Sequence, residues 1–290
     1  MSLKQIYQPI SKELSQVEME LKNVVSRLIG ADNSKQVIKH FFNIPGKRLR
    51  PALVLLSAKA VSTSDFRLPT SDLLSLATAV ELIHSASLIH DDIVDSADKR
   101  REQVSLNKQF GNKIAVLTGD LLYTSAFLRL TDKLDKKIIR ILSQCVQKMC
   151  AGEINELQNT SSDTCHSESR KKRDKLQRRI SYLKIIEDKT ASFMSACCQC
   201  GAELHGTNKK SVDGLTNYGL NLGMTYQIID DYIDKDSVVV ADLGLRQAEE
   251  FASKAKHSIK TLKNSIYKEK LSDLVDYIMG MKDQSSLCLK

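Results

Sequence analysis

Apolar residues recur along the chain at spacings of three and four, which places them on one face of an α-helix. The first such segment covers residues 3–29, with a break expected near Pro9. Only four prolines occur and none follows position 69, and proline is excluded from helix interiors because it lacks the backbone N–H. Strand-like alternation is not evident, and valines 238–240 are the best strand-like run. Further helices are predicted over residues 34–42, 52–61, 114–130, 136–159, 170–205, 211–234 and 242–282.

No linker and no repeat longer than one helix divides the 290 residues. We therefore expect a single all-α domain over residues 1–290, a bundle of about ten helices around a central cavity. Polar loops are predicted at 64–70 and 159–168. Gly119 lies inside the predicted helix 114–130, where glycine costs about 1 kcal/mol relative to alanine, and is expected to permit close helix packing.

Residues 81–101 read ELIHSASLIHDDIVDSADKRR, an apolar run that ends in Asp91, Asp92 and Asp95. Asp91 and Asp95 are four residues apart, so they lie on the same helix face and repel one another. A divalent cation between them would relieve the repulsion, and Mg²⁺ takes carboxylate oxygens while leaving positions for phosphate oxygens. The guanidinium groups that follow, Arg100 and Arg101, suit a metal-complexed polyphosphate.

A second apolar run ends in the same way. Residues 223–234 read GMTYQIIDDYID, with Asp230 and Asp234 as the stacked pair and Asp231 between them. A single acidic helix end is equally compatible with a solvated surface. The presence of two such helix ends favours the interpretation that they form two walls of one metal-binding cavity.

Composition narrows the class of protein. Hydrophobic residues at 42% and charged residues at 27% are typical of a soluble globular protein, and no apolar run approaches the ~20 residues of a membrane span. The first residues carry no secretory or transit signal, so a cytoplasmic location is expected. The net charge of +8 is compatible with nucleic acid or with small anionic substrates, but tryptophan is absent and no nucleic acid partner is expected. The seven cysteines are interpreted as reduced thiols rather than zinc ligands.

A basic turn, PGKRLRP at 45–51, precedes the predicted helix 52–61. The positive end of that helix dipole would lie beside Lys47 and Arg50, which favours an anion. An ordinary charged surface turn is the alternative.

Taken in order, these motifs resemble the trans-isoprenyl diphosphate synthases, also called polyprenyl synthetases, over about residues 40–235. Each motif is weak alone, but the ordered set is specific. The corresponding segments are GKRLRP at 46–51, the first acidic motif with Arg-Arg at 91–101, GDLL at 119–122, GE and a glutamine at 152–158, KT at 189–190 and YQIIDDYID at 226–234.

The resemblance implies a prenyltransferase that condenses isopentenyl diphosphate with an allylic diphosphate of the farnesyl or geranylgeranyl type. The allylic C–O bond ionises with the help of three Mg²⁺ ions, the homoallylic double bond attacks the cation, and the leaving pyrophosphate accepts the proton. A homodimer is also implied, with a product that is delivered to a membrane.

The same resemblance assigns roles to individual residues. Asp91, Asp95 and Asp230 would hold the metal, supported by Asp92, Asp231 and Asp234. Isopentenyl diphosphate would be held by Lys47, Arg50, His84 and Arg101, and the allylic diphosphate by Lys189, Thr190 and Gln227, while Arg100 pulls on the leaving group. The expected catalytic set comprises Asp91, Asp95, Asp230, Arg100 and Lys189. His84 also has an alternative interpretation, as a hydrogen-bonded histidine of a helix.

Product length is predicted from the turn before Asp91. In the family, bulky aromatic residues there stop chain growth early. Here the positions hold Ala86 and Ser87, which predicts a long-chain product of C25 or more.

The sequence departs from the family pattern in two places. Glu102 stands where the family usually has glycine after Arg-Arg, and the lysine-bearing loop that usually follows the second motif has no counterpart after Asp234. Four alternatives stay open: a shorter-chain farnesyl or geranylgeranyl diphosphate synthase, a non-catalytic partner subunit of a heteromeric synthase, a class I terpene cyclase, and a helical protein that binds anions or nucleic acid.

Overall fold

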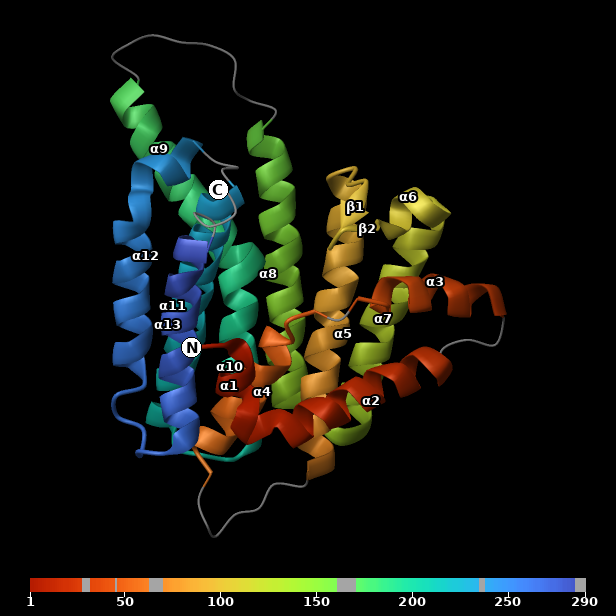
Figure 1. Ribbon diagram of the computed structural model, residues 1–290, viewed down its shortest axis with the longest axis horizontal. Coiled ribbons are helices and arrows are strands. Elements are labelled where there is room, and N and C mark those ends of the chain that lie inside the picture. Colours follow the sequence, from red (N-terminus) through yellow and green to blue (C-terminus); the bar gives the residue numbers. More distant parts are fainter. Residues whose placement is uncertain (28–31, 45, 63–69, 161–170, 235–237, 285–290) are drawn as a thin grey trace. The chain divides into compact units, whose positions relative to one another are not determined.

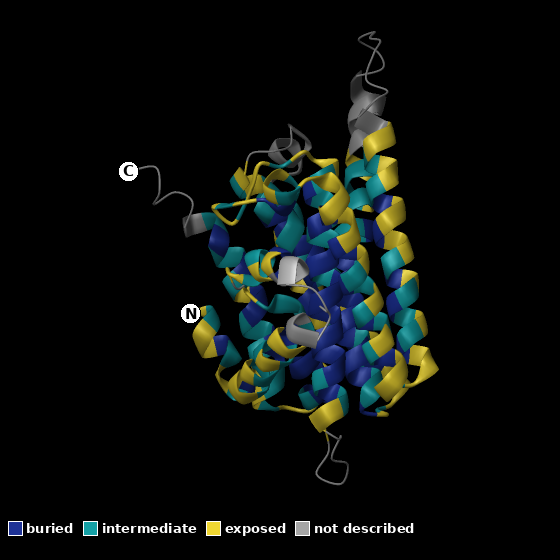
Figure 2. Cartoon of the chain, turned by 90° about the vertical axis from the view of Figure 1, so that its right-hand side faces the viewer, coloured by how far each residue is buried: buried dark blue, intermediate teal, exposed yellow. Residues whose placement is uncertain are grey.

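The structure is a computed structural model that describes residues 1–27, 32–44, 46–62, 70–160, 171–234 and 238–284. Its internal contacts divide the chain into two compact units. The N-terminal unit comprises Ile10–Leu55 and Leu68–Ile139, and the C-terminal unit comprises Met1–Pro9, Leu56–Arg67 and Arg140–Lys290. The described residues are almost entirely helical, which confirms the predicted all-α fold, and buried positions lie on the inner faces of the helices (Figure 2).

The N-terminal unit is organised around α5, Thr70–Val94, whose long apolar run packs against α7, Asn112–Lys133 (Figure 1). Helix α5 is long and apolar enough to cross a bilayer, but 72% of its apolar window is buried inside the protein, as in a core helix. Gly119 of α7 permits the close approach that was predicted, because a Cβ there would lie 2.2 Å from Nε2 of His90. The other elements of this unit are α2 (Ser11–Arg27), α3 (Asp32–Phe42), the first part of α4 (Leu49–Ala60), β1 (Lys99–Arg100), β2 (Gln103–Val104) and α6 (Leu106–Phe110).

The C-terminal unit is organised around α11, Lys209–Asp234, which packs against α10 (Ser192–Leu204), α12 (Val238–Ser258) and α13 (Ile266–Gln284) (Figure 1). Tyr218 of α11 is fully buried, and its hydroxyl donates a hydrogen bond to the carbonyl oxygen of Leu271 at 2.7 Å. The remaining elements are α1 (Leu3–Tyr7), the 3₁₀ turn η1 (Gln8–Ile10), α8 (Lys136–Thr160), α9 (Lys171–Ile186) and the π-helix η2 (Glu187–Ala191).

Local details complete the helical pattern. Valines 238–240, a run too short to build a sheet, begin the helix α12. Residues 102–112, for which the sequence predicted no regular element, contain β2 and the short helix α6. Lys99–Arg100 and Gln103–Val104 form a small antiparallel hairpin that the sequence did not reveal. The break expected near Pro9 is confirmed by η1. The loops predicted at 64–70 and 159–168 lie for the most part outside the described residues, as do residues 235–237 after the second acidic motif.

Candidate active site

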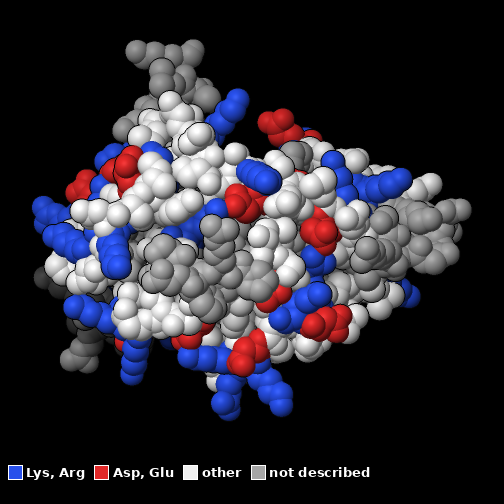
Figure 3. Space-filling view, turned by 90° about the horizontal axis from the view of Figure 1, so that it is seen from below, with Lys and Arg blue, Asp and Glu red and all other residues white. Residues whose placement is uncertain are grey.

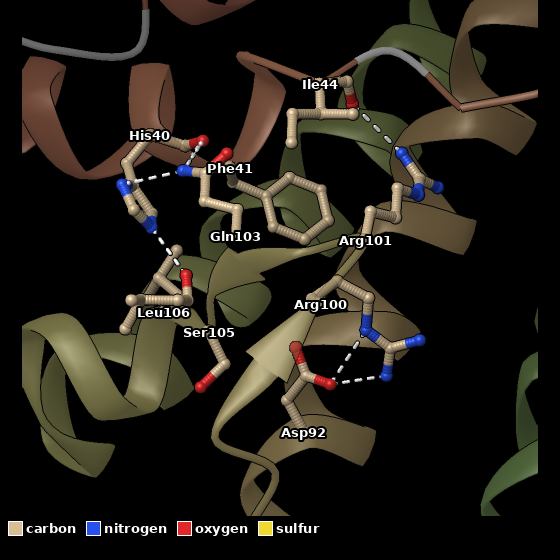
Figure 4. Close-up of a pocket in the computed structure, with 10 residues that line it drawn as sticks. His40, Phe41, Ile44, Asp92, Arg100, Arg101, Gln103, Ser105 and Leu106 are labelled. Carbon is tan, nitrogen blue, oxygen red and sulfur yellow. Dashed lines mark hydrogen bonds and ion pairs between the residues drawn. The ribbon is translucent and has the colours of Figure 1, made fainter.

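The first acidic motif occupies the C-terminal end of α5, and its three aspartates have different surroundings. Asp92 is 1% exposed, and its Oδ1 accepts hydrogen bonds from Nε of Arg100, at 2.8 Å, and from Nη2 of the same guanidinium (Figure 4). Asp91 is half-buried and Asp95 is exposed. The middle aspartate therefore holds an arginine. Asp95 lies one residue beyond the end of α5, and its backbone N–H donates to the carbonyl oxygen of Asp91 at 2.8 Å, so the outer pair keeps helical spacing.

The Arg100 contact depends on the hairpin Lys99–Val104, in which Arg100 pairs with Gln103. The two turn residues have positive φ angles, 50° at Arg101 and 64° at Glu102. Tight two-residue hairpin turns favour such angles and therefore glycine or asparagine. The glycine that the resemblance expects at position 102 thus has a conformational reason, and this chain places a glutamate in the same backbone conformation.

Helix α3 holds the hairpin through His40. Nε2 of His40 lies 2.8 Å from the carbonyl oxygen of Val104, and Nδ1 lies 2.8 Å from Nε2 of Gln103. Both contacts are satisfied when the imidazole carries its proton on Nε2, donating to the carbonyl and accepting from the amide. Figure 4 shows these side chains around a small pocket next to Asp92 and Arg100.

The predicted isopentenyl diphosphate residues come together in the N-terminal unit. Nη1 of Arg50 donates to Nε2 of His84 at 2.9 Å. Nη1 of Arg101 donates to the carbonyl oxygen of Ile44 at 3.1 Å, and a Cβ on Gly46, beside Lys47, would lie 2.7 Å from Arg101 Nη2. Burial, together with the charges of Arg50 and Arg101, lowers the pKa of His84 well below its usual value. His84 is therefore neutral near pH 7 and accepts a hydrogen bond.

The basic turn is fixed by Arg48, which sequence reasoning did not single out. Arg48 has a φ of 52°, and its Nη1 donates to Oε1 of Glu81 at 2.6 Å. Glu18 of α2 accepts from the same guanidinium, with Nη2–Oε2 at 3.2 Å. Glu81 is 2% exposed, and burial raises its pKa above the usual value, opposed by the charge of Arg48. A lone glutamate inside an apolar helix was the available signal for this contact, because a buried charge requires a partner.

The second acidic motif ends α11, and its middle aspartate is again held by the protein. Oδ2 of Asp231 accepts a hydrogen bond from the Tyr182 hydroxyl at 2.6 Å, and Oδ1 accepts one from Nε2 of Gln227 at 2.7 Å. Oε1 of Gln227 accepts from Thr190 Oγ1 at 2.8 Å, so the predicted pair Thr190 and Gln227 is brought together. Asp230 is half-buried and Asp234 is exposed. Burial raises the pKa of Tyr182 far above its usual value, reinforced by the contact with Asp231, so the phenol stays a donor.

Lys189 lies on the π-helix η2, a form of helix that frequently marks functional sites. Its ammonium group pairs with Glu153 Oε2 at 2.5 Å and with Glu156, both from α8. Burial lowers the pKa of Lys189, but the two glutamates outweigh that effect and the net pKa is raised. Lys189 is therefore a cation. Sequence reasoning missed both of its carboxylate partners, although they lie in the GE segment that carries the resemblance.

The donor set of each motif fits a divalent cation bound together with a diphosphate. Within the described residues, no group of three or more His, Cys, Asp or Glu side chains could hold a metal ion. Mg²⁺ typically takes one or two carboxylates and completes its shell with water and phosphate oxygens. Asp91 with Asp95, and Asp230 with Asp234, offer such pairs of hard oxygen ligands at helical spacing.

The predicted chain-length residues differ in their environment. Ala86 is fully buried, whereas Ser87 is half-buried and its Oγ donates to the carbonyl oxygen of His84 at 2.9 Å. Ser87 lies four residues before Asp91 and so on the same face of α5. The role of both residues in product length stays a prediction.

The chain is similar in sequence to known proteins. Residues 32–240 match the polyprenyl synthetase family. Octaprenyl diphosphate synthase of Escherichia coli (strain K12) is 34% identical over 189 residues, which cover 65% of this chain and 53% of that protein. Heptaprenyl diphosphate synthase component 2 of Geobacillus stearothermophilus is 32% identical over 234 residues, covering 81% of this chain and 67% of that protein.

A solved structure shows the same fold. The polyprenyl synthase from Caulobacter crescentus CB15, complexed with calcium and isoprenyl diphosphate, superimposes with a TM-score of 0.80 at 23% identity, over 96% of this chain and 97% of that one. The all-α fold of this chain is the fold of that structure. The chain belongs to the polyprenyl synthetase family, and it spans about half the length of the Escherichia coli relative.

Proposed function

We propose that the protein is a trans-prenyltransferase that condenses isopentenyl diphosphate with an allylic diphosphate to give a long-chain polyprenyl diphosphate. The observation that carries this proposal is the convergence of Arg50 and Arg101 on His84, with Lys47 beside the glycine that Arg101 contacts. Guanidinium and ammonium groups gathered at one place suit an anionic ligand, and diphosphate matches the fork geometry of guanidinium groups. The names of the related octaprenyl and heptaprenyl synthases support the long-chain assignment.

In the proposed reaction, the outer aspartates of the two motifs, Asp91 with Asp95 and Asp230 with Asp234, would hold the metal ions that bind the allylic diphosphate. The chemistry that three bound Mg²⁺ ions would supply is Lewis-acid neutralisation of the leaving diphosphate. Arg100 and Lys189 would direct N–H donors at the leaving diphosphate as the C–O bond breaks, which stabilises charge that grows in the transition state. The double bond of isopentenyl diphosphate forms the new C–C bond, and pyrophosphate leaves with the proton. The calcium and isoprenyl diphosphate bound to the Caulobacter protein support a divalent metal of this kind.

Purified protein incubated with farnesyl diphosphate, labelled isopentenyl diphosphate and Mg²⁺ tests the proposal. We expect labelled products longer than the primer after chromatography. Replacing Asp91 and Asp95 together by asparagine should abolish incorporation, whereas Asp98→Asn, at an exposed residue paired with Lys108, should not change it. No incorporation by the wild type, alone or with a partner subunit, would falsify the enzyme assignment.

A heteromeric enzyme is the second candidate, because one related protein is component 2 of a heptaprenyl diphosphate synthase. We favour a homodimer, since α7 exposes apolar side chains along one face: Ile114 at 44%, Leu117 at 67% and Leu128 at 66%. Leu117→Glu should shift the molar mass in solution from dimer to monomer in light scattering. A wild-type protein that is monomeric and inactive without a second chain would favour the heteromer.

We further propose a cytoplasmic enzyme that releases its product to a membrane and does not bind nucleic acid. Figure 3 shows lysines and arginines interspersed with aspartates and glutamates on one face, rather than a continuous basic stripe. Mixed charge of this kind gives little support for tracking a nucleic acid backbone. Product recovered from vesicles added to the assay, and no retention on immobilised DNA, are the expected results.

A further inference from the structure

The last turn of α11 carries three carboxylates and is electrostatically unfavourable as a free helix end. Asp230, Asp231 and Asp234 lie where the helix dipole is already negative, and no basic residue occupies that turn. Asp230 and Asp234 also repel each other at a spacing of four residues. Helix ends fray readily, so this turn needs contacts from outside α11 to stay ordered.

Tyr182 of α9 supplies such a contact. Its hydroxyl donates to Oδ2 of Asp231 at 2.6 Å, while Gln227, one turn earlier on α11, donates to Oδ1 at 2.7 Å. Both oxygens of Asp231 are therefore held by protein donors. The same Gln227 amide accepts from Thr190 at 2.8 Å, so one hydrogen-bonded chain runs from α9 through α11 to η2.

In the first acidic motif, too, the protein holds the middle aspartate, but it does so with a charged group. There the middle carboxylate, Asp92, is buried and held by the guanidinium of Arg100. In α11 a neutral phenol takes the place of the arginine. A neutral donor holds the carboxylate without adding a positive charge that would compete with a metal ion for Asp230 and Asp234.

We propose that Tyr182 is a positioning residue: by holding Asp231, it keeps the last turn of α11 helical and orients Asp230 and Asp234 toward a metal–diphosphate ligand. Asp231 then acts as an anchor for that turn and not as a metal ligand. The inference rests on the proposed function and adds a residue to it. Outer-shell donors of this kind typically change metal affinity about 10- to 100-fold when they are removed.

Tyr182→Phe removes only the hydroxyl and keeps the ring. The matched control is Tyr232→Phe, which removes the same group from a 40% exposed tyrosine on the same turn of α11. The direct measurement is calorimetric titration of inorganic pyrophosphate into protein with Mg²⁺, which needs no turnover. We expect Tyr182→Phe to weaken Mg²⁺-dependent pyrophosphate binding about 10-fold or more, and Tyr232→Phe to match the wild type.

Two further readouts separate positioning from general loss of structure. Amide hydrogen exchange should become faster in the peptide covering residues 226–234 and stay unchanged in α5. The double variant Tyr182→Phe with Asp231→Asn should bind pyrophosphate with Mg²⁺ about as tightly as Asp231→Asn alone, because the hydrogen-bond partner of Tyr182 is already altered. Unchanged pyrophosphate affinity in Tyr182→Phe, with binding by the wild type, would overturn the inference. Failure of the wild type to bind pyrophosphate with Mg²⁺ would instead count against the proposed function, and the Tyr182 inference would fall with it.

Discussion

Gly223 of α11 lies directly against the backbone of Ala191, so that a Cβ at Gly223 would stand 2.5 Å from Cα of Ala191 and 2.9 Å from its Cβ. Ala191 ends the π-helix that carries Lys189 and Thr190. The missing side chain therefore sets how closely the second acidic helix approaches the residues proposed to hold the allylic diphosphate.

We expect Gly223→Ala to destabilise the protein by about 1–3 kcal/mol, since backbone atoms cannot move aside as a flexible side chain can. The control is Gly280→Ala on α13, where a Cβ would meet nothing within 4 Å. That change should be neutral or stabilising by up to about 1 kcal/mol, because alanine is the better helix former. Urea unfolding of both variants measures the difference, and equal midpoints would show that the contact is looser than the structure indicates.

Glu102 provides a second test, at the turn of the hairpin that positions Arg100. Its φ of 64° costs a residue with a Cβ about 1–2 kcal/mol, partly offset by the greater freedom of glycine in the unfolded chain. We expect Glu102→Gly to stabilise the protein by about 0.5 kcal/mol. Gly111, with a φ of 84° and open space around it, is the converse control, and Gly111→Ala should destabilise. A fall in the thermal midpoint of Glu102→Gly would contradict the turn geometry.

The acidic helices were predictable because helical periodicity alone places Asp91 above Asp95 and Asp230 above Asp234. The role of the middle aspartates was not predictable from that pattern. Asp92 meets Arg100 only because Arg101 and Glu102 turn the chain back with positive φ angles, and neither is a residue that marks such a turn.

Contacts between helices that are distant in the sequence could not be predicted either. Tyr182 and Asp231 are 49 residues apart, and no local pattern links them. Glu81 was closer to being predictable, because a charge within an apolar helix implies a buried partner, but the pattern did not say that the partner was Arg48 rather than Lys47 or Arg50. Glu153 and Glu156 likewise look like an ordinary polar helix face until Lys189 is seen between them.

The Arg48–Glu81 pair predicts a pH-dependent stability. Replacing Arg48 by Met leaves Glu81 buried without its guanidinium, which typically costs about 3–5 kcal/mol near neutral pH. The pKa of Glu81 in the folded protein is already raised by burial, and loss of Arg48 raises it further. The folded state then binds more protons than the unfolded state between the unfolded and folded pKa values, so stability falls as pH rises through that window.

Urea unfolding of Arg48→Met at several pH values should therefore show recovery of stability as the pH is lowered from 8 toward about 5. The double variant Arg48→Met with Glu81→Gln is the control, since it removes the charge and should lose most of the pH dependence. A pH-independent deficit in Arg48→Met would mean that Glu81 is stabilised by other groups. The same variant should weaken isopentenyl diphosphate binding, because Arg48 fixes the turn that carries Lys47 and Arg50.

Product length offers the last test, and the structure changes which substitution is informative. Ala86 is fully buried, so Ala86→Phe must displace core atoms and is expected to destabilise by about 1–3 kcal/mol as well as to alter the product. Ser87 is half-buried and lies on the Asp91 face, so Ser87→Tyr can extend along that face with less disturbance of the core. We expect Ser87→Tyr to shorten the main product while the protein retains its unfolding midpoint. Chromatography of the products decides the matter: an unchanged chain length in a folded, active Ser87→Tyr enzyme would remove the argument that small side chains before Asp91 permit long products.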